Sequence, residues 1–122
     1  MRKAIFLDRD GVINKIFIKN NIPTSPLSFD QLEILPGVKE SISKLKKINF
    51  ACLLVTNQPD VSRGKIEKKI VIKMNNHLKK EIKLDDIFVC YHDDQDNCIC
   101  RKPKPGLLLE ASKKWNVDLT KS

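Results

Sequence analysis

The sequence has no long hydrophobic run, because charged residues interrupt its apolar stretches at short intervals. A membrane-spanning helix needs about 18 consecutive apolar residues, and no stretch approaches that length. The apolar stretch at residues 4–7 ends at Asp8, so it is too short for the core of a secretory signal peptide. These absences predict a cytoplasmic protein without membrane contact.

Aromatic residues are also scarce, at 6% of the chain. Proteins that bind single-stranded nucleic acid stack bases on aromatic side chains, and this sequence offers few. The formal charge is +8, but the lysines are scattered along the chain and are not interleaved with aromatic residues. This pattern favours a solvated basic surface and no nucleic-acid partner. A zinc-stabilised nucleic-acid binding module is the alternative, since the charge and the cysteines are compatible with it.

The chain has only four cysteines, and they are unevenly distributed. Cys52 lies in the apolar run "FACLLV", which predicts a buried core thiol. The other three lie between residues 90 and 100, beside a histidine. In a cytosolic chain, such crowding indicates metal binding rather than disulfides.

The length of 122 residues suits a single domain, 1–122. Near-continuous apolar runs at residues 3–7, 50–56 and 86–91 predict strands buried on both faces. Apolar residues at spacings of three and four predict a helix after Gly37 and another from Arg63 to Ile82. A third helix is predicted to begin near Pro105 and to run to Trp115.

The alternation of strands and helices predicts an α/β fold, with a Rossmann-like parallel sheet and helices on both faces. Residues 11–36, with prolines at 23, 26 and 36, are predicted to be a long loop. Its length allows a flap or hairpin but no cap domain. Only three strands are predicted, which is few for such a sheet.

Two acidic residues follow the first predicted strand, in the sequence "FLDRDGVIN". In open α/β sheets, ligands bind beyond the carboxyl ends of the strands. Asp8 and Asp10 are two residues apart, so their side chains are expected to point the same way. One could attack a substrate or hold a cation, while the other transfers a proton. The alternative is a solvated strand end followed by a turn at Gly11.

The second predicted strand ends in "TNQ", residues 56–58. The Thr56 hydroxyl and the backbone N–H groups that follow could face an anion. The signal is weak alone, because Thr-Asn at a strand end is often only a turn. It gains weight because this strand end and Asp8 are predicted to lie at the same sheet edge.

The sequence "CYHDDQDNCICRKPKPG", residues 90–106, contains two close pairs of metal-ligand residues. Three sulfurs and one nitrogen suit a closed, tetrahedral, structural zinc site. Arg101 and Lys102 follow directly, so zinc would fix two cations that could clamp a phosphate. Chance clustering of reduced cysteines is the alternative. The predicted ligands are Cys90, His92, Cys98 and Cys100.

Together, "FLDRDGVIN", "VTNQPDVSRG" and the cysteine-rich segment resemble the haloacid dehalogenase-like phosphatases. Within them, the resemblance is to the branch of the heptose 1,7-bisphosphate 7-phosphatases and histidinol-phosphate phosphatases, from residue 3 to about residue 115. It implies that Asp8 is the nucleophile and Asp10 the acid and base. It further implies roles for Thr56, Asn57, Arg101 and Lys102 at the phosphoryl group, and for Arg9, Asn57, Gln58 and Arg63 near the substrate.

The implied function is removal of the 7-phosphate of D-glycero-D-manno-heptose 1,7-bisphosphate through an aspartyl-phosphate. A monomer is expected. Histidinol phosphate is the alternative substrate. The family also implies catalytic Mg²⁺ at Asp8 and Asp10, beside structural Zn²⁺. A cation is needed physically, because two unit charges about 4 Å apart repel by roughly 4 kcal/mol at an effective dielectric near 20.

The family pattern continues beyond the last predicted helix into a strand that ends in acidic residues, whereas this sequence ends at Ser122. The resemblance therefore predicts a C-terminally truncated domain, a magnesium site that lacks a carboxylate, and an unpaired edge on the first strand. We expect poor hydrolysis by residues 1–122 alone. An inactive phosphatase-like protein is a further alternative.

Overall fold

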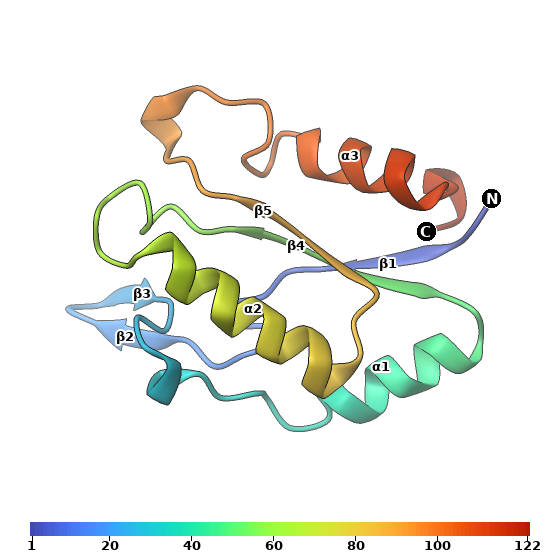
Figure 1. The fold of residues 1–122 in the computed structure, drawn as a ribbon, viewed down its shortest axis with the longest axis horizontal. Helices are drawn as coiled ribbons and strands as arrows, with labels where there is room; N and C mark the ends of the chain where they lie inside the picture. Colours follow the sequence, from blue (N-terminus) through green and yellow to red (C-terminus); the bar gives the residue numbers. More distant parts are fainter.

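The structure is a computed structural model that describes residues 1–122, apart from the side chain of Asp94. A parallel three-stranded sheet is covered by helices on both faces (Figure 1), which confirms the predicted fold. The strands of this sheet are β1 (Ala4–Leu7), β4 (Ala51–Asn57) and β5 (Asp86–Cys90), in the order β1-β4-β5. The α-helices are α1 (Val38–Lys47), α2 (Lys68–Ile82) and α3 (Gly106–Trp115).

The central strand β4 supplies side chains to both faces of the sheet. Leu53 and Val55 pack with Leu107 of α3 in one apolar cluster. Cys52 and Leu54 belong to a second cluster, together with side chains of α1 and α2. Alternate residues of a strand point to opposite faces, so one continuous apolar run can form two cores. Cys52 is fully buried, as predicted.

Helix α2 begins at Lys68, later than the start at Arg63 that the apolar spacing predicts. Residues 59–65 instead form turns, in which the Arg63 N–H donates to the Pro59 carbonyl at 3.0 Å. Gly64 has a φ of 73°, in the left-handed region that favours glycine. The side chains before Lys68 therefore lie in a loop at the carboxyl end of β4.

The long loop between β1 and α1 contains a hairpin, one of the two structures that its length allows. Strands β2 (Phe17–Lys19) and β3 (Ile22–Thr24) pair in antiparallel fashion, and a short 3-10 helix, η1 (Phe29–Gln31), follows. Asn20 and Asn21 have φ values of 52° and 62°, which suit a tight two-residue hairpin turn. The hairpin lies beyond the carboxyl end of β1 (Figure 1).

Strand β1 is an outer strand of the sheet, since β4 is its one partner among the named strands. Beside its start, Arg2 and Val117 form an isolated parallel bridge. The Ala4 N–H donates to the Ser122 hydroxyl at 3.0 Å. The chain after α3, including η3 (Leu119–Lys121), therefore lies along the beginning of β1.

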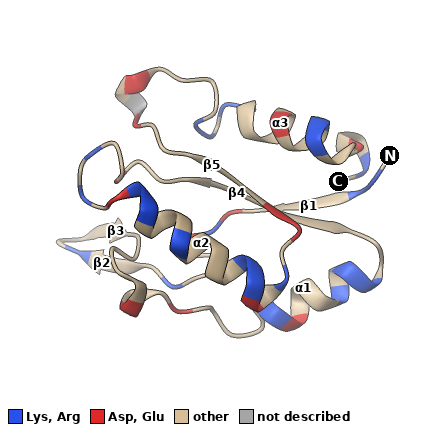
Figure 2. Cartoon of the chain, viewed as in Figure 1, with Lys and Arg blue, Asp and Glu red and all other residues tan. Residues whose placement is uncertain are grey.

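The basic residues occur on all three α-helices (Figure 2), as their scattered positions in the sequence predict. None of the helices in the described part of the chain combines the length and apolarity that crossing a bilayer requires.

Candidate functional site

The ends of the three parallel strands bring the predicted site residues to one edge of the sheet. Asp8 follows β1, and Asn57 is the last residue of β4. At the end of β5, the carbonyl of Cys90 accepts a hydrogen bond from the Gln58 N–H at 2.7 Å. This edge is where ligands bind in open α/β sheets.

Asp8 and Lys102 form an ion pair at this edge. The Lys102 Nζ lies 3.0 Å from Asp8 Oδ1, and 49% of the Asp8 side chain is exposed. Lys102 also donates to the Val55 carbonyl at 2.9 Å, which fixes its ammonium group above the end of β4. Lys102 is one of the two cations that the sequence predicts to follow the metal cluster, and the structure places it against Asp8. An exposed carboxylate beside a fixed ammonium can receive a phosphate.

Asn57 holds the backbone of Lys102. Its Nδ2 donates to the Lys102 carbonyl at 3.2 Å, and its Oδ1 accepts from the Lys102 N–H at 3.0 Å. This reciprocal pair joins the end of β4 to the segment that follows the last cysteine. Asn57 therefore positions Lys102, and its own contact with a phosphoryl group stays a prediction.

We expect Asn57→Ala to weaken the binding of orthovanadate, a phosphate analogue, by about 10-fold. Two hydrogen bonds worth roughly 1 kcal/mol each are lost, so the segment that carries Lys102 becomes less ordered. Isothermal titration calorimetry measures the affinity. Asn76→Ala, at an exposed position of α2, is the matched control and should bind as the unmodified chain does. Equal affinities for Asn57→Ala and this control would refute the positioning role.

Asp10 is surrounded by polar side chains that donate hydrogen bonds to it, and 16% of its own side chain is exposed. Burial alone would raise the pKa of Asp10, but the charge of Arg9 and the hydrogen bonds outweigh it, so the pKa is lowered. Asp10 is therefore a carboxylate at neutral pH. Its Oδ1 accepts from Arg9 Nε at 3.1 Å, Arg9 Nη2 at 2.9 Å and Asn14 Nδ2 at 3.0 Å, and its Oδ2 accepts from Ser25 Oγ and Gln58 Nε2, both at 2.9 Å.

Three predicted site residues have internal side chains. Arg9 and Thr56 are fully buried, and Gln58 is 3% exposed. The Gln58 amide donates to Asp10 and, at 3.0 Å, to the Thr56 hydroxyl. These side chains hold Asp10 in place, and direct contact of Arg9, Thr56 or Gln58 with a substrate stays a prediction.

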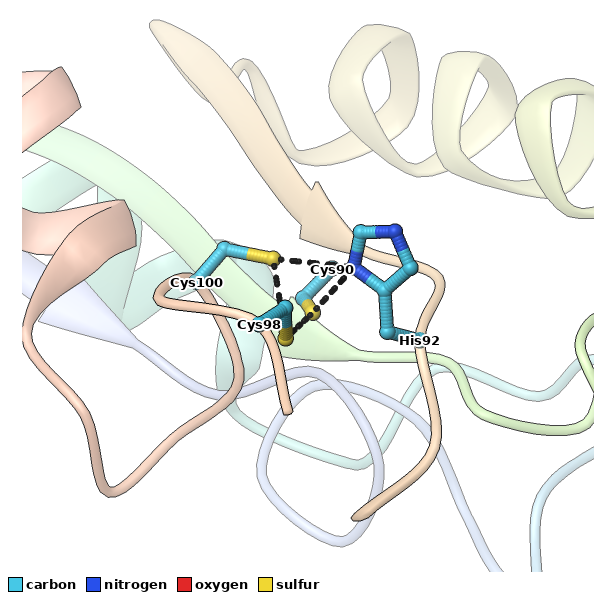
Figure 3. Close-up of side chains that lie close together, drawn as sticks. All are labelled: Cys90, His92, Cys98 and Cys100. Carbon is cyan, nitrogen blue, oxygen red and sulfur yellow. Dashed lines mark hydrogen bonds between the residues drawn. The ribbon is translucent and has the colours of Figure 1, made fainter. Parts of the chain in front are cut away.

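The four predicted zinc ligands meet at the end of β5 (Figure 3). Their ligand atoms all lie within 4.8 Å of one another. Cys90 Sγ lies 3.5 Å from Cys98 Sγ, and His92 Nδ1 lies 3.4 Å from Cys100 Sγ. Three thiols and one imidazole at these separations fit a tetrahedral Zn²⁺ site.

The thiols differ in acidity. Burial opposes the ionisation of Cys98, but a backbone N–H from Arg101 and the neighbouring thiols outweigh it and lower its pKa to about 6. Burial and the nearby Cys90 and Cys98 sulfurs raise the pKa of Cys100 to about 12. The cluster therefore resists carrying several thiolates unless a cation neutralises them.

Arg63 links the loop after β4 to the cysteine-rich segment. Its Nε and Nη2 donate to the two Asp93 oxygens at 2.7 and 2.8 Å. Arg101 donates from Nη1 to the His92 carbonyl at 3.3 Å, so it lies against the metal cluster. A phosphate clamp by Arg101 and a substrate contact by Arg63 stay predictions.

A cavity of about 190 Å³ beside the cluster is lined by Asp93, Cys98, Arg101, Lys102, Pro103 and Lys104.

The residues present offer magnesium few ligands. Within the described side chains, the cysteine-histidine cluster is the one group of three or more acidic, histidine or cysteine residues arranged to hold a metal. At the sheet edge, the resemblance to the family predicts the Asp8 carboxylate and the Asp10 carbonyl oxygen as its ligands. Mg²⁺ is often held by one or two carboxylates together with substrate phosphates and water, so this set fits a site that phosphate completes.

Two hydrogen-bond partners of Asp10 were not predicted from the sequence. Ser25 comes from the segment after the hairpin, and nothing in its surroundings in the sequence marks it. Asn14 is fully buried, and its position four residues after Asp10 in "DGVIN" could have drawn attention to it.

Comparisons with known proteins support the predicted family. Residues 3–122 match the model of the family described as Polynucleotide kinase 3 phosphatase. The chain is 34% identical to a D-glycero-beta-D-manno-heptose-1,7-bisphosphate 7-phosphatase of Helicobacter pylori, over 98% of this chain and 69% of that protein. Enzymes of the same name from Haemophilus influenzae and Escherichia coli are 32% and 34% identical, over 100% and 98% of this chain and 69% and 65% of their own lengths.

Solved structures give the same result. The heptose 1,7-bisphosphate phosphatase of B. bronchiseptica, crystallised with magnesium and phosphate, superposes with a TM-score of 0.81 at 31% identity. The superposition covers 96% of this chain and 65% of that one. A Mesorhizobium loti protein, at a TM-score of 0.83 and 24% identity, supports the fold alone, over 97% of this chain and 59% of its own. The chain spans about two thirds of the length of these relatives.

Proposed function

Because the chain belongs to the haloacid dehalogenase-like D-glycero-D-manno-heptose 1,7-bisphosphate 7-phosphatase family, we propose that it hydrolyses phosphomonoesters at the edge of its parallel sheet. The observation that carries this proposal is the 3.0 Å contact between Asp8 and Lys102. It places an exposed carboxylate against a cation held by the cysteine-rich segment. Hydrolysis by the 122-residue chain itself is proposed to be slow, because the described sheet edge offers magnesium few ligands.

In the proposed reaction, an Asp8 carboxylate oxygen attacks the phosphorus, and the bond between phosphorus and the leaving oxygen breaks. Asp10 gives that oxygen a proton. It then takes a proton from water, which attacks the aspartyl-phosphate and releases phosphate. Lys102 stabilises the charge on the transferred group. Magnesium, when bound at Asp8 and the Asp10 carbonyl, would offset the repulsion between carboxylate and phosphate.

The hydrogen bonds around Asp10 suit the second step directly, because they maintain a carboxylate that can act as a base. The first step needs a protonated Asp10. A phosphate beside Asp10 raises its pKa by like-charge repulsion, which favours proton uptake when the substrate binds. The same side chain can therefore act as acid and then as base.

We propose a phosphorylated heptose, and specifically the 7-phosphate of heptose 1,7-bisphosphate, as the substrate. The relatives that bear this name support the proposal, as does the segment "QPDVSRG", which favours it over histidinol phosphate. Within the part of the chain that the structure describes, no cap domain covers the site, so we propose that small loops such as residues 59–65 select the substrate. The name of the matching family model makes a 3′-phosphorylated oligonucleotide a useful comparison.

Phosphate release by the zinc-loaded chain with Mg²⁺ tests this proposal, with three substrates in parallel: heptose 1,7-bisphosphate, histidinol phosphate and a 3′-phosphorylated oligonucleotide. We expect kcat/KM to be at least about 10-fold higher for the heptose bisphosphate. A preference for either other substrate would overturn the assignment of the sugar. Absence of release from all three would favour the inactive phosphatase-like alternative.

A further inference from the structure

Arg9 is a fully buried arginine whose guanidinium group contacts two different elements. Its Nε and Nη2 donate to Asp10 Oδ1 at 3.1 and 2.9 Å. Its Nη1 donates in the other direction, to the side-chain oxygen of Asn75 in α2, at 3.0 Å. The guanidinium group therefore bridges helix α2 and the carboxylate proposed as acid and base.

Asn75 is well placed to fix this bridge. Only 4% of it is exposed, and it lies on the buried side of α2 beside Met74, between the core residues Val71 and Leu78. These apolar neighbours anchor the helix to the sheet. The Asn75 oxygen is therefore a rigid acceptor for an arginine that has no contact with solvent.

We propose that Asn75 is a positioning residue for phosphoryl transfer and acts on Asp10 through Arg9. This inference rests on the proposed function. A guanidinium group has five N–H donors in a rigid plane, and a buried donor without an acceptor is costly. If the Asn75 oxygen is removed, the guanidinium group must rotate toward another acceptor. Rotation breaks the paired contact with Asp10 Oδ1, because the plane moves as one unit.

Removal of the Asn75 oxygen is expected to slow proton transfer by Asp10 and to leave substrate binding unchanged. Asp10 Oδ2 stays bonded to Ser25 and Gln58, but loss of the Arg9 contacts leaves the carboxylate held on one side only. A displacement of about 1 Å at a reacting group can cost up to 100-fold in rate. The ion pair of Lys102 with Asp8 and its hydrogen bond to Val55 do not involve Asn75, so phosphate binding should be preserved.

The kinetic test compares Asn75→Leu, which removes the acceptor, with Asn75→Asp, which retains one. Asn76→Leu, at the exposed neighbouring position, is the matched control. The leaving oxygen of a sugar phosphate needs a proton. For this substrate we expect Asn75→Leu to lower the rate constant of the first turnover at saturating substrate by about 10-fold, without changing the substrate concentration that gives half of the maximal rate. For p-nitrophenyl phosphate, whose leaving group departs as an anion, the first turnover should stay within about 2-fold. Asn75→Asp should recover most of the rate on the sugar phosphate. Equal losses on both substrates would mark a merely structural role and overturn the proposal.

A second measurement does not depend on activity. With ¹⁵N-arginine labelling, the Arg9 side-chain N–H signals should exchange slowly with water in the unmodified chain and in Asn76→Leu, and at least about 10-fold faster in Asn75→Leu, because the anchored donor loses its partner. Unchanged Arg9 signals in Asn75→Leu would overturn the positioning role. If the unmodified chain hydrolyses none of the substrates, the proposed function fails, while these signals still decide whether Asn75 fixes Arg9.

Discussion

Asp8→Asn should reduce phosphate release by at least about 1000-fold, the largest kinetic effect that we expect from any single substitution. The amide of asparagine cannot form the aspartyl-phosphate, so hydrolysis through a covalent intermediate at residue 8 is prevented. The fold should be retained, because Asp8 is half exposed and its ion pair with Lys102 contributes less than about 1 kcal/mol to stability. Release of inorganic phosphate and the thermal unfolding midpoint are measured on the same preparation.

Asp30→Asn is the matched control for this substitution. Asp30 is an exposed aspartate in η1, so its loss should leave the rate within about 2-fold. A rate for Asp8→Asn within 10-fold of the unmodified chain would mean that another group attacks the phosphorus. The assignment of the nucleophile would then be wrong.

Loss of the metal cluster should produce the largest effect on stability. We expect Cys98→Ser to bind no zinc at neutral pH and to unfold at least about 10 °C below the zinc-loaded chain. The cluster joins the end of β5 to the segment that carries Arg101 and Lys102, so phosphate binding should be lost as well. Zinc content by mass spectrometry, thermal unfolding and orthovanadate titration measure the three effects.

Cys52→Ala is the matched control, because it distinguishes the effect of losing the metal site from the effect of losing any one thiol. Cys52 is buried against Leu54 and lies outside the cluster, so this variant should keep one zinc per chain despite a modest loss of stability. A Cys98→Ser chain that retains stoichiometric zinc would contradict the assignment of the cluster. So would a chelator that removes zinc without lowering the unfolding midpoint.

The sequence was sufficient to predict the parallel strands and the metal cluster, because both depend on local patterns. Buried parallel strands appear as short apolar runs, and Leu53 and Leu54 show why, since adjacent residues enter opposite cores. The spacing of Cys90, His92, Cys98 and Cys100 determines which atoms can converge around one ion. Asp8 could be placed because it directly follows a recognisable strand.

The surroundings of Asp10 could not be predicted, because they depend on contacts between distant parts of the chain. Ser25, in a loop, donates a hydrogen bond to Asp10, and Asn75, in helix α2, accepts one from Arg9. No local periodicity of the sequence encodes such contacts. Arg9 shows the same limit. Nothing in the sequence around Arg9 indicates that its side chain is fully buried and paired with Asp10. The start of α2 was also misplaced, because turns after Pro59 interrupt the helical spacing.

Chemical trapping of the covalent intermediate tests the central assignment most directly. The zinc-loaded chain is mixed with p-nitrophenyl phosphate and Mg²⁺, quenched in acid within milliseconds, and treated with borohydride, which reduces an aspartyl-phosphate to homoserine. Peptide mass spectrometry should then find homoserine at position 8, and none in the Asp8→Asn variant. Homoserine at another aspartate, or product formation without modification of residue 8, would contradict the account.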